Sequence, residues 1–280
     1  MSSNCLILII EKSNSPKLVM KSLTTLFLAL VFSLNTFADT VSDKEKEALL
    51  KFYHATNGSQ WKIKWDLSLS ISTWYGVEIE NGKVAGLNLP DNNLQGELPL
   101  EFFDLVNLER IDLHKNKLAG TLPNAVSGFK ELEVLDISSN KISGQLPLNF
   151  GNLKKLEILS LFDNEIEGQL PSSIYTITTL KVLLLNSNKF SGNLSKEILN
   201  LNALQNLSLF NNSFDGEIPE ELEKLKNLSE MNLSYNKFKG AVSKKLTLLD
   251  SLNMTMFDED GNPFLLDLIE EKIPENIIAN

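Results

Sequence analysis

Residues 105–120 read LVNLERIDLHKNKLAG, and this stretch decides the fold of the chain. Asn116 and Gly120 of this stretch each recur every 24 residues. The asparagines are Asn92, Asn116, Asn140, Asn164, Asn188, Asn212 and Asn236. The glycines are Gly96, Gly120, Gly144, Gly168, Gly192, Gly216 and Gly240. A period kept through seven turns without insertion or deletion indicates a solenoid, in which stacked units share one continuous core.

Each position in the repeat has a physical role. Ile111 and Leu113 alternate with polar residues and predict a short strand whose apolar side chains enter the core. Equivalent strands should stack in parallel, about 4.8 Å apart. Asn116 follows the strand, where its amide can satisfy backbone groups in the bend with both donors and an acceptor. Gly120 permits a backbone conformation that side chains resist, and Pro123 favours an extended convex segment over a full helix.

The proline position varies between units. Proline stands at Pro99, Pro123, Pro147, Pro171 and Pro219, and serine replaces it at Ser195 and Ser243. Proline fixes its own φ and keeps the preceding residue out of the helical region. We therefore expect the convex path to loosen slightly in the two turns that carry serine.

The pattern LxxLxxLxLxxNxLxGxLP resembles the 24-residue leucine-rich repeat, of the plant type found in receptor-kinase ectodomains, polygalacturonase-inhibiting proteins and secreted bacterial relatives. The resemblance covers residues 84–248. It implies an α/β fold: a right-handed solenoid with a parallel concave sheet, 3-10 or extended convex segments, and a cap at each end.

The flanks resemble the caps of the same family. Residues 74–77, WYGV, are similar to the WxGV motif of the N-terminal cap, and residues 261–265, GNPFL, to the GNPxL motif of the C-terminal cap. Plant members usually pin both caps with cysteine pairs, but Cys5 is the only cysteine here. This departure favours an exported bacterial protein over a plant receptor.

The N-terminal segment, residues 1–38, contains the pattern of a secretory signal peptide. Residues 20–38 carry Lys21 directly after Met20, continue with a short apolar run and end in an approximate small-x-small cleavage site before Asp39. The run is too short for a membrane span. We expect Met20 to be the true start, with a longer signal region from Met1 as the alternative. The mature protein should be secreted, periplasmic or on the cell surface, with no integral membrane span.

Residues 39–83 are predicted to form a helical N-terminal cap. Ser42 and Glu45 have the spacing of a capping box at the start of a helix. All tryptophans of the chain, Trp61, Trp65 and Trp74, lie in this segment. We interpret them as closing the apolar end of the solenoid, with a carbohydrate-stacking platform as the alternative.

Residues 249–280 are predicted to form a C-terminal cap and tail. Residues 258–262, DEDGN, look superficially like a calcium loop. They lack the alternating ligands and the distal glutamate of that loop, so we expect a turn of the cap. Residues 265–280 are compatible with a closing helix or a loose tail.

Charge and composition exclude several classes of function. The net charge of −10 argues against binding nucleic acid or an anionic membrane, which require a basic surface. Asp112, His114 and Asp136 could in principle serve a metal or a catalytic group on adjacent strands. The face is open, however, and surface charges balanced by Arg110 and Lys115 explain them as well. We therefore expect that the protein has no enzymatic activity and binds neither a metal nor a cofactor.

The outward positions of the strands form the candidate binding surface on the concave side. In the middle turns these positions are apolar on a face that should otherwise be polar, which suggests a partner. Scattered apolar residues without consequence are the alternative. The predicted ligand-binding residues are Arg110, Asp112, His114, Asp136, Ile158, Phe162, Val182, Leu184, Asn206, Phe210, Glu230 and Asn232.

The sequence predicts a protein or peptide as the partner. One alternative is a cell-surface polysaccharide, bound through Phe162, Phe210 and the polar rim. Another is inhibition of an extracellular hydrolase, which rests on fold analogy alone. The sequence leaves the oligomeric state and the identity of the ligand open.

Overall fold

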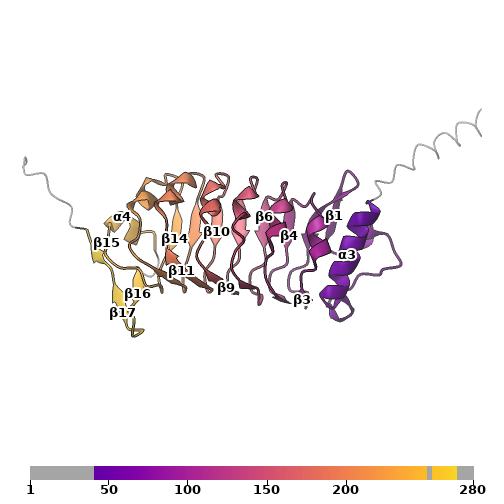
Figure 1. Cartoon of the computed structure of the whole chain (residues 1–280), viewed down its shortest axis with the longest axis horizontal. Coiled ribbons are helices and arrows are strands. Elements are labelled where there is room, and N and C mark those ends of the chain that lie inside the picture. Colours follow the sequence, from indigo (N-terminus) through magenta and orange to yellow (C-terminus); the bar gives the residue numbers. More distant parts are fainter. Residues whose placement is uncertain (1–40, 251–253, 270–280) are drawn as a thin grey trace, which may run out of the picture. The chain divides into compact units, whose positions relative to one another are not determined.

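The structure is a computed structural model of the chain and describes residues 41–250 and 254–269. The predicted signal region, with its start at Met20 and its cleavage before Asp39, lies outside the described residues. The same holds for the tail beyond Ile269. Within the described part, the repeats stack side by side (Figure 1).

One side of the stack is an eight-stranded sheet with the order β1-β2-β4-β6-β8-β10-β12-β14. Its strands are β1 (Val77–Glu80), β2 (Lys83–Asn88), β4 (Arg110–Asp112), β6 (Val134–Asp136), β8 (Ile158–Ser160), β10 (Val182–Leu184), β12 (Asn206–Ser208) and β14 (Glu230–Asn232). β1 and β2 are antiparallel, and the later pairs are parallel. Ile111 faces Leu87 and Leu135, so equivalent repeat positions are neighbours. The predicted parallel stacking is confirmed.

A second set of short strands follows the bend that recurs in each turn, and the sequence did not predict these strands. A four-stranded sheet has the order β13-β11-β9-β7, and a separate pair joins β3 to β5. The strands are β3 (Gln95–Glu97), β5 (Lys117–Ala119), β7 (Ser143–Gly144), β9 (Glu165–Gly168), β11 (Lys189–Asn193) and β13 (Ser213–Asp215). They alternate around a single buried residue, such as Ile166, which is too short a pattern to identify a strand.

The convex side carries short 3-10 helices, as the resemblance implied. They are η3 (Leu100–Asp104), η4 (Asn124–Gly128), η5 (Phe150–Asn152), η6 (Ser172–Thr176), η7 (Lys196–Asn200) and η8 (Glu220–Lys224). Pro99, Pro123, Pro171 and Pro219 stand immediately before four of them, in extended backbone. A 3-10 helix fits here because each turn leaves room for only a few helical residues.

The serine turns differ from the loosened path predicted for them. Ser195 donates its backbone N–H to the Tyr175 hydroxyl at 3.3 Å, a bond that proline could not make. The Ser195 hydroxyl also accepts the N–H of Glu197 at 3.1 Å. Ser243 likewise caps α4 (Lys244–Thr247), where it accepts the N–H of Leu246. In these two turns, hydrogen bonds made by serine therefore take the place of the conformational restriction that proline gives in the other turns.

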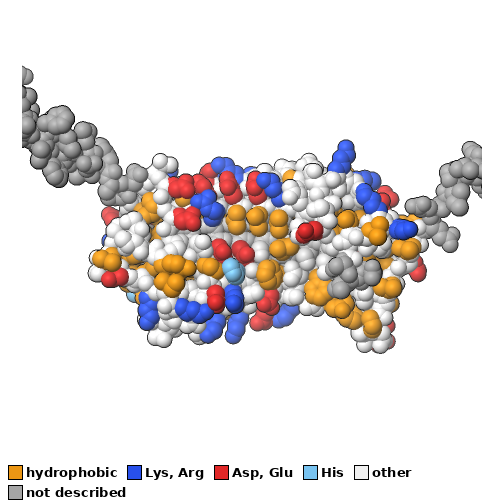
Figure 2. All heavy atoms as spheres, turned by 180° about the vertical axis from the view of Figure 1, so that it is seen from behind, with side chains coloured by type: hydrophobic (Ala, Val, Ile, Leu, Met, Phe, Trp, Pro, Cys, Tyr) orange, Lys and Arg blue, Asp and Glu red, His pale blue; other side chains and the backbone are white. Residues whose placement is uncertain are grey.

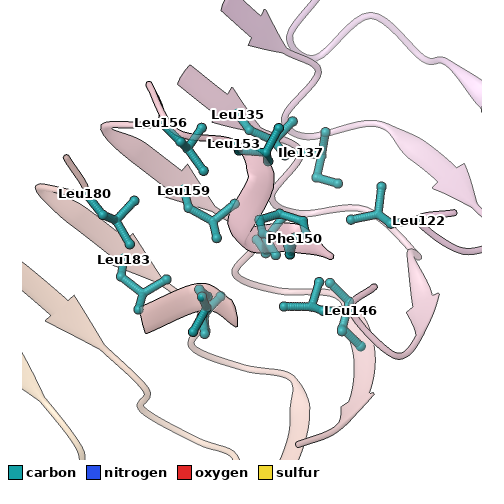
Figure 3. Close-up of a cluster of buried hydrophobic side chains, with 14 of the residues drawn as sticks. Leu122, Leu135, Ile137, Leu146, Phe150, Leu153, Leu156, Leu159, Leu180 and Leu183 are labelled. Carbon is teal, nitrogen blue, oxygen red and sulfur yellow. The ribbon is translucent and has the colours of Figure 1, made fainter. Parts of the chain in front are cut away.

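The core is a continuous column of apolar side chains between the strands and the 3-10 helices. Leu153, Leu156, Leu159 and Leu183 are fully buried, as is the ring of Phe150. Figure 3 shows these side chains from successive turns pointing into one interior. Burial of apolar area contributes about 25 cal/mol per Å² and is the main term holding neighbouring turns together.

The asparagines bond the turns to one another as the sequence predicted. The Asn164 Oδ1 accepts the N–H of Ile142 at 2.9 Å. Its Nδ2 donates to the carbonyls of Ile137 at 3.0 Å and Leu161 at 3.1 Å. Asn116, Asn140, Asn188, Asn212 and Asn236 repeat this set of bonds. Each amide thus connects its own turn to the preceding one.

The N-terminal end is closed by α3 (Asp43–Ala55) and by two 3-10 turns, η1 (Gly58–Gln60) and η2 (Ile71–Thr73). The capping box of Ser42 and Glu45 is present at the start of α3. Trp61, Trp65 and Trp74 are 2%, 4% and 2% exposed, so their indoles fill the end of the core. Such burial fits the closing role and leaves no stacking platform at these side chains.

The C-terminal end is closed by strands. β16 (Thr255–Phe257) and β17 (Pro263–Leu265) form a hairpin, and β18 (Asp267–Leu268) pairs with β15 (Ala241–Val242). The Asp258 carboxylate accepts the N–H groups of Asn262 at 2.8 Å and Asp260 at 2.9 Å. The bond from the Asn262 N–H is the main cause that lowers the pKa of Asp258. The Asp258 carboxylate thus stabilises a turn of the C-terminal cap. This agrees with the prediction of a cap turn rather than a calcium loop.

Candidate functional site

The sheet face is the surface formed by the side chains that leave the eight-stranded sheet away from the core. Three positions of each turn contribute to it, those of Arg110, Asp112 and His114. The register aligns them in columns, because Arg110 pairs with Val134 and Asp112 pairs with Asp136. All twelve predicted ligand-binding residues lie on this face, and none is buried.

An apolar row crosses the middle of the sheet face. Val134, Ile158 and Val182 are direct neighbours in the strand register, and all are half-buried. Leu184 and Phe162 continue the apolar surface in the adjoining columns. Figure 2 looks onto this face and shows the row beside a band of acidic and basic side chains. Val134 is absent from the predicted set, although its position in the repeat is that of Ile158.

A hollow of about 490 Å³ lies at the C-terminal part of the sheet face. Five of the predicted residues line it: Leu184, Asn206, Phe210, Glu230 and Asn232. Leu248 and Leu249 also line it, and Leu248 is 77% exposed. The hollow therefore combines apolar walls with amide and carboxylate groups.

An aromatic row lies beside this hollow. The rings of Phe210 and Tyr235 are 4.9 Å apart between centroids, and those of Tyr235 and Phe257 are 5.0 Å apart. All three side chains are half-buried. Phe257 comes from the C-terminal cap, so the repeat pattern gave no reason to include it.

Arg110 and Lys115, near the N-terminal part of the face, form ion pairs with other residues than the predicted Asp112 and Asp136. Arg110 pairs with Glu78 at 2.8 Å and with Glu80 at 3.3 Å, both on β1. These partners, Glu78 first, raise the pKa of Arg110. The Glu78 side chain reaches Arg110 by lying over Gly86, where a Cβ atom would stand 2.5 Å from its Oε2.

Lys115 points to Asp91, at 3.6 Å, so neither predicted counter-charge reaches Asp112 or Asp136. The interpretation of balanced surface charges is therefore wrong for this pair. The physical reason is the antiparallel return of β1, which offers two carboxylates to Arg110 and which the repeat pattern does not encode.

Asp112, His114 and Asp136 form a polar cluster next to the apolar row. The Asp112 Oδ1 lies 2.7 Å from the His114 Nδ1. The Asp136 Oδ1 accepts the backbone N–H and the hydroxyl of Ser138, at 2.9 and 2.6 Å. One ligand atom from each residue lies within 4.8 Å of the others. One imidazole and two carboxylates are a sparse set for a transition metal, whose sites usually hold more nitrogen or sulfur ligands.

Ser160 belongs to the same column and was not predicted. It pairs in register with Asp136 on one side and Leu184 on the other. The side chain is 2% exposed, and its Oγ has no hydrogen-bond partner. Serine is common in this sequence, so nothing but its register position next to Asp136 could have singled it out.

The sequence of the chain is similar to those of known leucine-rich repeat proteins. A family model described as a leucine-rich repeat region matches residues 134–256, and one described as a leucine rich repeat matches residues 83–142. Over 100 residues, the chain is 34% identical to the leucine-rich repeat receptor protein kinase EMS1 of Arabidopsis thaliana. That match covers 35% of this chain and 8% of the kinase. The chain thus spans only part of the length of its curated relatives: 8% of EMS1, and 33% of the leucine-rich repeat protein FLOR 1 of Arabidopsis thaliana.

Solved structures show the same fold. A plant ice-binding protein superposes with a TM-score of 0.68 at 26% identity, covering 81% of this chain and 71% of that one. The plant peptide hormone receptor RGFR1 in complex with RGF2 gives a TM-score of 0.54 at 27% identity, covering 63% and 27%. Among the described residues of our chain, no helix has the length and apolar character needed to cross a membrane.

Proposed function

The chain belongs to the leucine-rich repeat family, and from this premise we propose that it binds a protein or peptide through its sheet face. The observation that carries the proposal is the apolar row of Val134, Ile158 and Val182, continued by Leu184 and Phe162. Half-exposed apolar side chains in direct register lose contact with water together when a partner covers them.

The polar surroundings support recognition by adding direction to this attraction. Asn206 donates to Glu230 on the next strand, and both line the hollow together with Phe210. A partner that fills the hollow would meet amide and carboxylate groups at its rim and apolar groups at its walls. RGFR1, which has a similar structure, is a plant peptide hormone receptor. The role proposed here is therefore binding rather than catalysis.

The proposed site of action is outside the cytoplasm. Residues 20–38 have the pattern of a secretory signal, and a solenoid without cysteines after Cys5 needs no disulfide chemistry to fold after export. Packing of the repeats supplies its stability instead.

An aromatic row favours polysaccharide binding as a second candidate function. Phe210, Tyr235 and Phe257 present rings at successive distances of 4.9 and 5.0 Å, next to the amides of Asn206 and Asn232. Aromatic faces with neighbouring hydrogen-bonding groups suit amphipathic ligands such as sugars.

The test compares capture by the wild-type protein and by a double variant, Phe162→Ala with Phe210→Ala. Proteins captured from the envelope and culture medium of the source organism should disappear with the double variant. The matched control is Leu100→Ala with Leu148→Ala, which truncates side chains that are 72% and 83% exposed on the convex side. It should retain the captured proteins.

Two outcomes would overturn the first proposal. One is capture that survives in the Phe162→Ala, Phe210→Ala variant. The other is the capture of glycans, and of no protein, by the wild-type chain on an array. The second outcome would support polysaccharide binding if the variant Tyr235→Ala then lost the glycan signal.

A further inference from the structure

The Asp112 and Asp136 carboxylates are adjacent, and among the described residues neither pairs with a lysine or an arginine. Asp112 is bonded to its neighbour His114, whose Nδ1 lies 2.7 Å from the Asp112 Oδ1. The two aspartates pair directly in the strand register, at the parallel-strand spacing of about 4.8 Å. Arg110 and Lys115, the nearest cations in sequence, are bound to Glu78 and Asp91 instead. Two like charges at this distance repel one another, so a cation placed between them would be favoured.

An unsatisfied hydroxyl lies in the same column. Ser160 follows Asp136 in the register, on the same side of the sheet, and its Oγ is buried without a hydrogen-bond partner. A buried polar atom without a partner is unfavourable in the free protein. Ammonium and guanidinium groups carry several N–H donors, so one that contacts Asp136 can also donate to a neighbouring hydroxyl.

We propose that the partner is a peptide segment with a lysine or arginine close to an apolar residue. The basic group binds the Asp112 and Asp136 carboxylates and the Ser160 hydroxyl, and the apolar residue covers Ile158, Val182 and Leu184. This inference rests on the proposed function and specifies the chemistry of its partner.

The charge of the surrounding surface is complementary to such a segment. Glu133 is exposed at the margin of the apolar row, one residue before Val134. Glu157 stands in the same position of the next turn, where it pairs with Lys181 at 2.7 Å. Because Glu157 is already neutralised by Lys181, the attraction for a basic segment rests on Glu133 and on the net charge of −10.

The strand spacing fixes the pattern expected in the segment. A peptide that runs along the stack crosses a strand about every 4.8 Å and advances about 3.3 Å per residue. The carboxylates lie on β4 and β6, and Leu184 lies two strands beyond β6 on β10. The basic and the apolar residue should therefore be separated by about three residues or fewer.

The test selects displayed random peptides on the purified full-length protein, without and with a chelator. Selected peptides should carry lysine or arginine within three residues of a leucine, isoleucine, valine or phenylalanine. Their affinity should fall about tenfold with the double variant Asp112→Asn, Asp136→Asn, and should weaken at high salt. Ser160→Ala should weaken binding about threefold to tenfold without lowering stability, because it removes an unpaired hydroxyl.

The variants are chosen to preserve the fold. Asn232 occupies the column of Asp136, and it accepts the N–H of Ser234 at 3.1 Å just as Asp136 accepts that of Ser138. Asparagine is therefore a native residue of this column. The charge-matched control is Glu167→Gln with Asp215→Asn, two exposed side chains on the other sheet. This control should bind the selected peptides as the wild type does.

The outcomes separate the inference from the proposed function. If no peptide is enriched and no protein is captured, the proposed function itself fails. If peptides are enriched without basic residues, or bind the Asp112→Asn, Asp136→Asn variant equally well, only the inference fails. Calorimetric titration with Zn²⁺ alone provides a third result. Tight binding that is lost in His114→Ala, without any preference for basic peptides, would replace the inference with a metal site.

Discussion

At the scale of single residues, the asparagine of each turn supplies hydrogen bonds to backbone N–H and carbonyl groups that would be left unpaired at the bend. The Asn164 side chain is 8% exposed and accepts one backbone N–H while donating to two carbonyls at 3.0 and 3.1 Å. Its role was predictable because the same residue type recurs at the same position in every turn.

The residue before each asparagine could not be predicted in the same way. Lys115, Ser139, Asp163 and Tyr235 all adopt a left-handed backbone, with φ between 50° and 59°. This conformation costs roughly 1–2 kcal/mol for residues other than glycine. The strand stacking compensates for it, since the Lys115 N–H donates to the carbonyl of Ser138. Because the residue type varies, the sequence shows no pattern there.

We predict that Asn164→Leu destabilises the protein by about 3 kcal/mol or more, because it leaves a buried N–H and buried carbonyls unpaired. Urea unfolding followed by circular dichroism measures the change. The control, Asn202→Leu, replaces an exposed asparagine on the convex side and should change stability by less than about 0.5 kcal/mol. Equal effects of both substitutions would contradict the bonding role.

Tyr175 predicts a specific dependence of stability on pH. Burial, the main cause, raises the pKa of Tyr175 above its ordinary value of about 10. Above that pH the unfolded chain loses the phenolic proton while the folded chain keeps it. Stability due to this group is therefore complete below about pH 10 and falls as pH rises through the raised pKa.

The variant Tyr175→Phe should remove this alkaline loss. At pH 7 it should cost about 1 kcal/mol, because the N–H of Ser195 loses its acceptor. Unfolding free energies of both proteins at pH 7 and at pH 10–11 provide the comparison. An alkaline decline of equal steepness in the two proteins would show that other groups cause it.

At the scale of elements, each end of the stack receives a buried carboxylate. Glu45, 6% exposed, caps α3 and also accepts the N–H of Val84 on β2 at 3.1 Å. Asp250, 2% exposed, accepts the N–H of Leu233 at 2.7 Å, one residue after β14. The capping box was visible in the sequence, but its second bond joins residues 39 positions apart. Such pairings depend on how the cap docks, which no local pattern specifies.

Glu45→Ala should destabilise the protein by about 2 kcal/mol, because both the helix cap and the acceptor for Val84 are lost. Glu45→Gln keeps an acceptor oxygen and should cost less than half as much. Chemical unfolding monitored by tryptophan fluorescence is a suitable measurement, since all tryptophans lie in this cap. If the Gln variant proved as unstable as the Ala variant, the charge rather than the hydrogen bonds would be responsible.

At the scale of the whole molecule, stability is a sum over contacts between neighbouring turns. Backbone and asparagine bonds connect each turn to the next one only, as from Lys115 to Ser138 and from Asn140 to Leu118. The period therefore predicted the fold over residues 84–248 and the membership of the sheet face. It did not predict that Arg110 turns toward β1, because that contact lies between a repeat and a cap. Consequently it became clear only in the structure that neither Asp112 nor Asp136 pairs with Arg110 or Lys115.

We predict that deleting residues 164–187, one full period, leaves a folded and cooperative protein. Asn188 would then follow Asp163 and restore the register. The denaturant m-value should fall by roughly one tenth, in proportion to the share of the folded body that is removed. Deleting residues 164–175 alone, half of a period, should instead abolish cooperative unfolding. Similar unfolding curves for the two deletions would contradict the neighbour-only account.

The buried Asp250 has a consequence for the length of the assembly. A column of equal turns has no inherent last member, because the final strand exposes the same donors that every earlier strand used for its neighbour. Asp250 accepts one of these donors, the N–H of Leu233, with one carboxylate oxygen, and it accepts the hydroxyl of Ser234 with the other. The position that another copy would occupy in end-to-end fibre growth is thereby filled from within the chain. One acidic side chain helps to keep a potentially open-ended polymer a discrete particle.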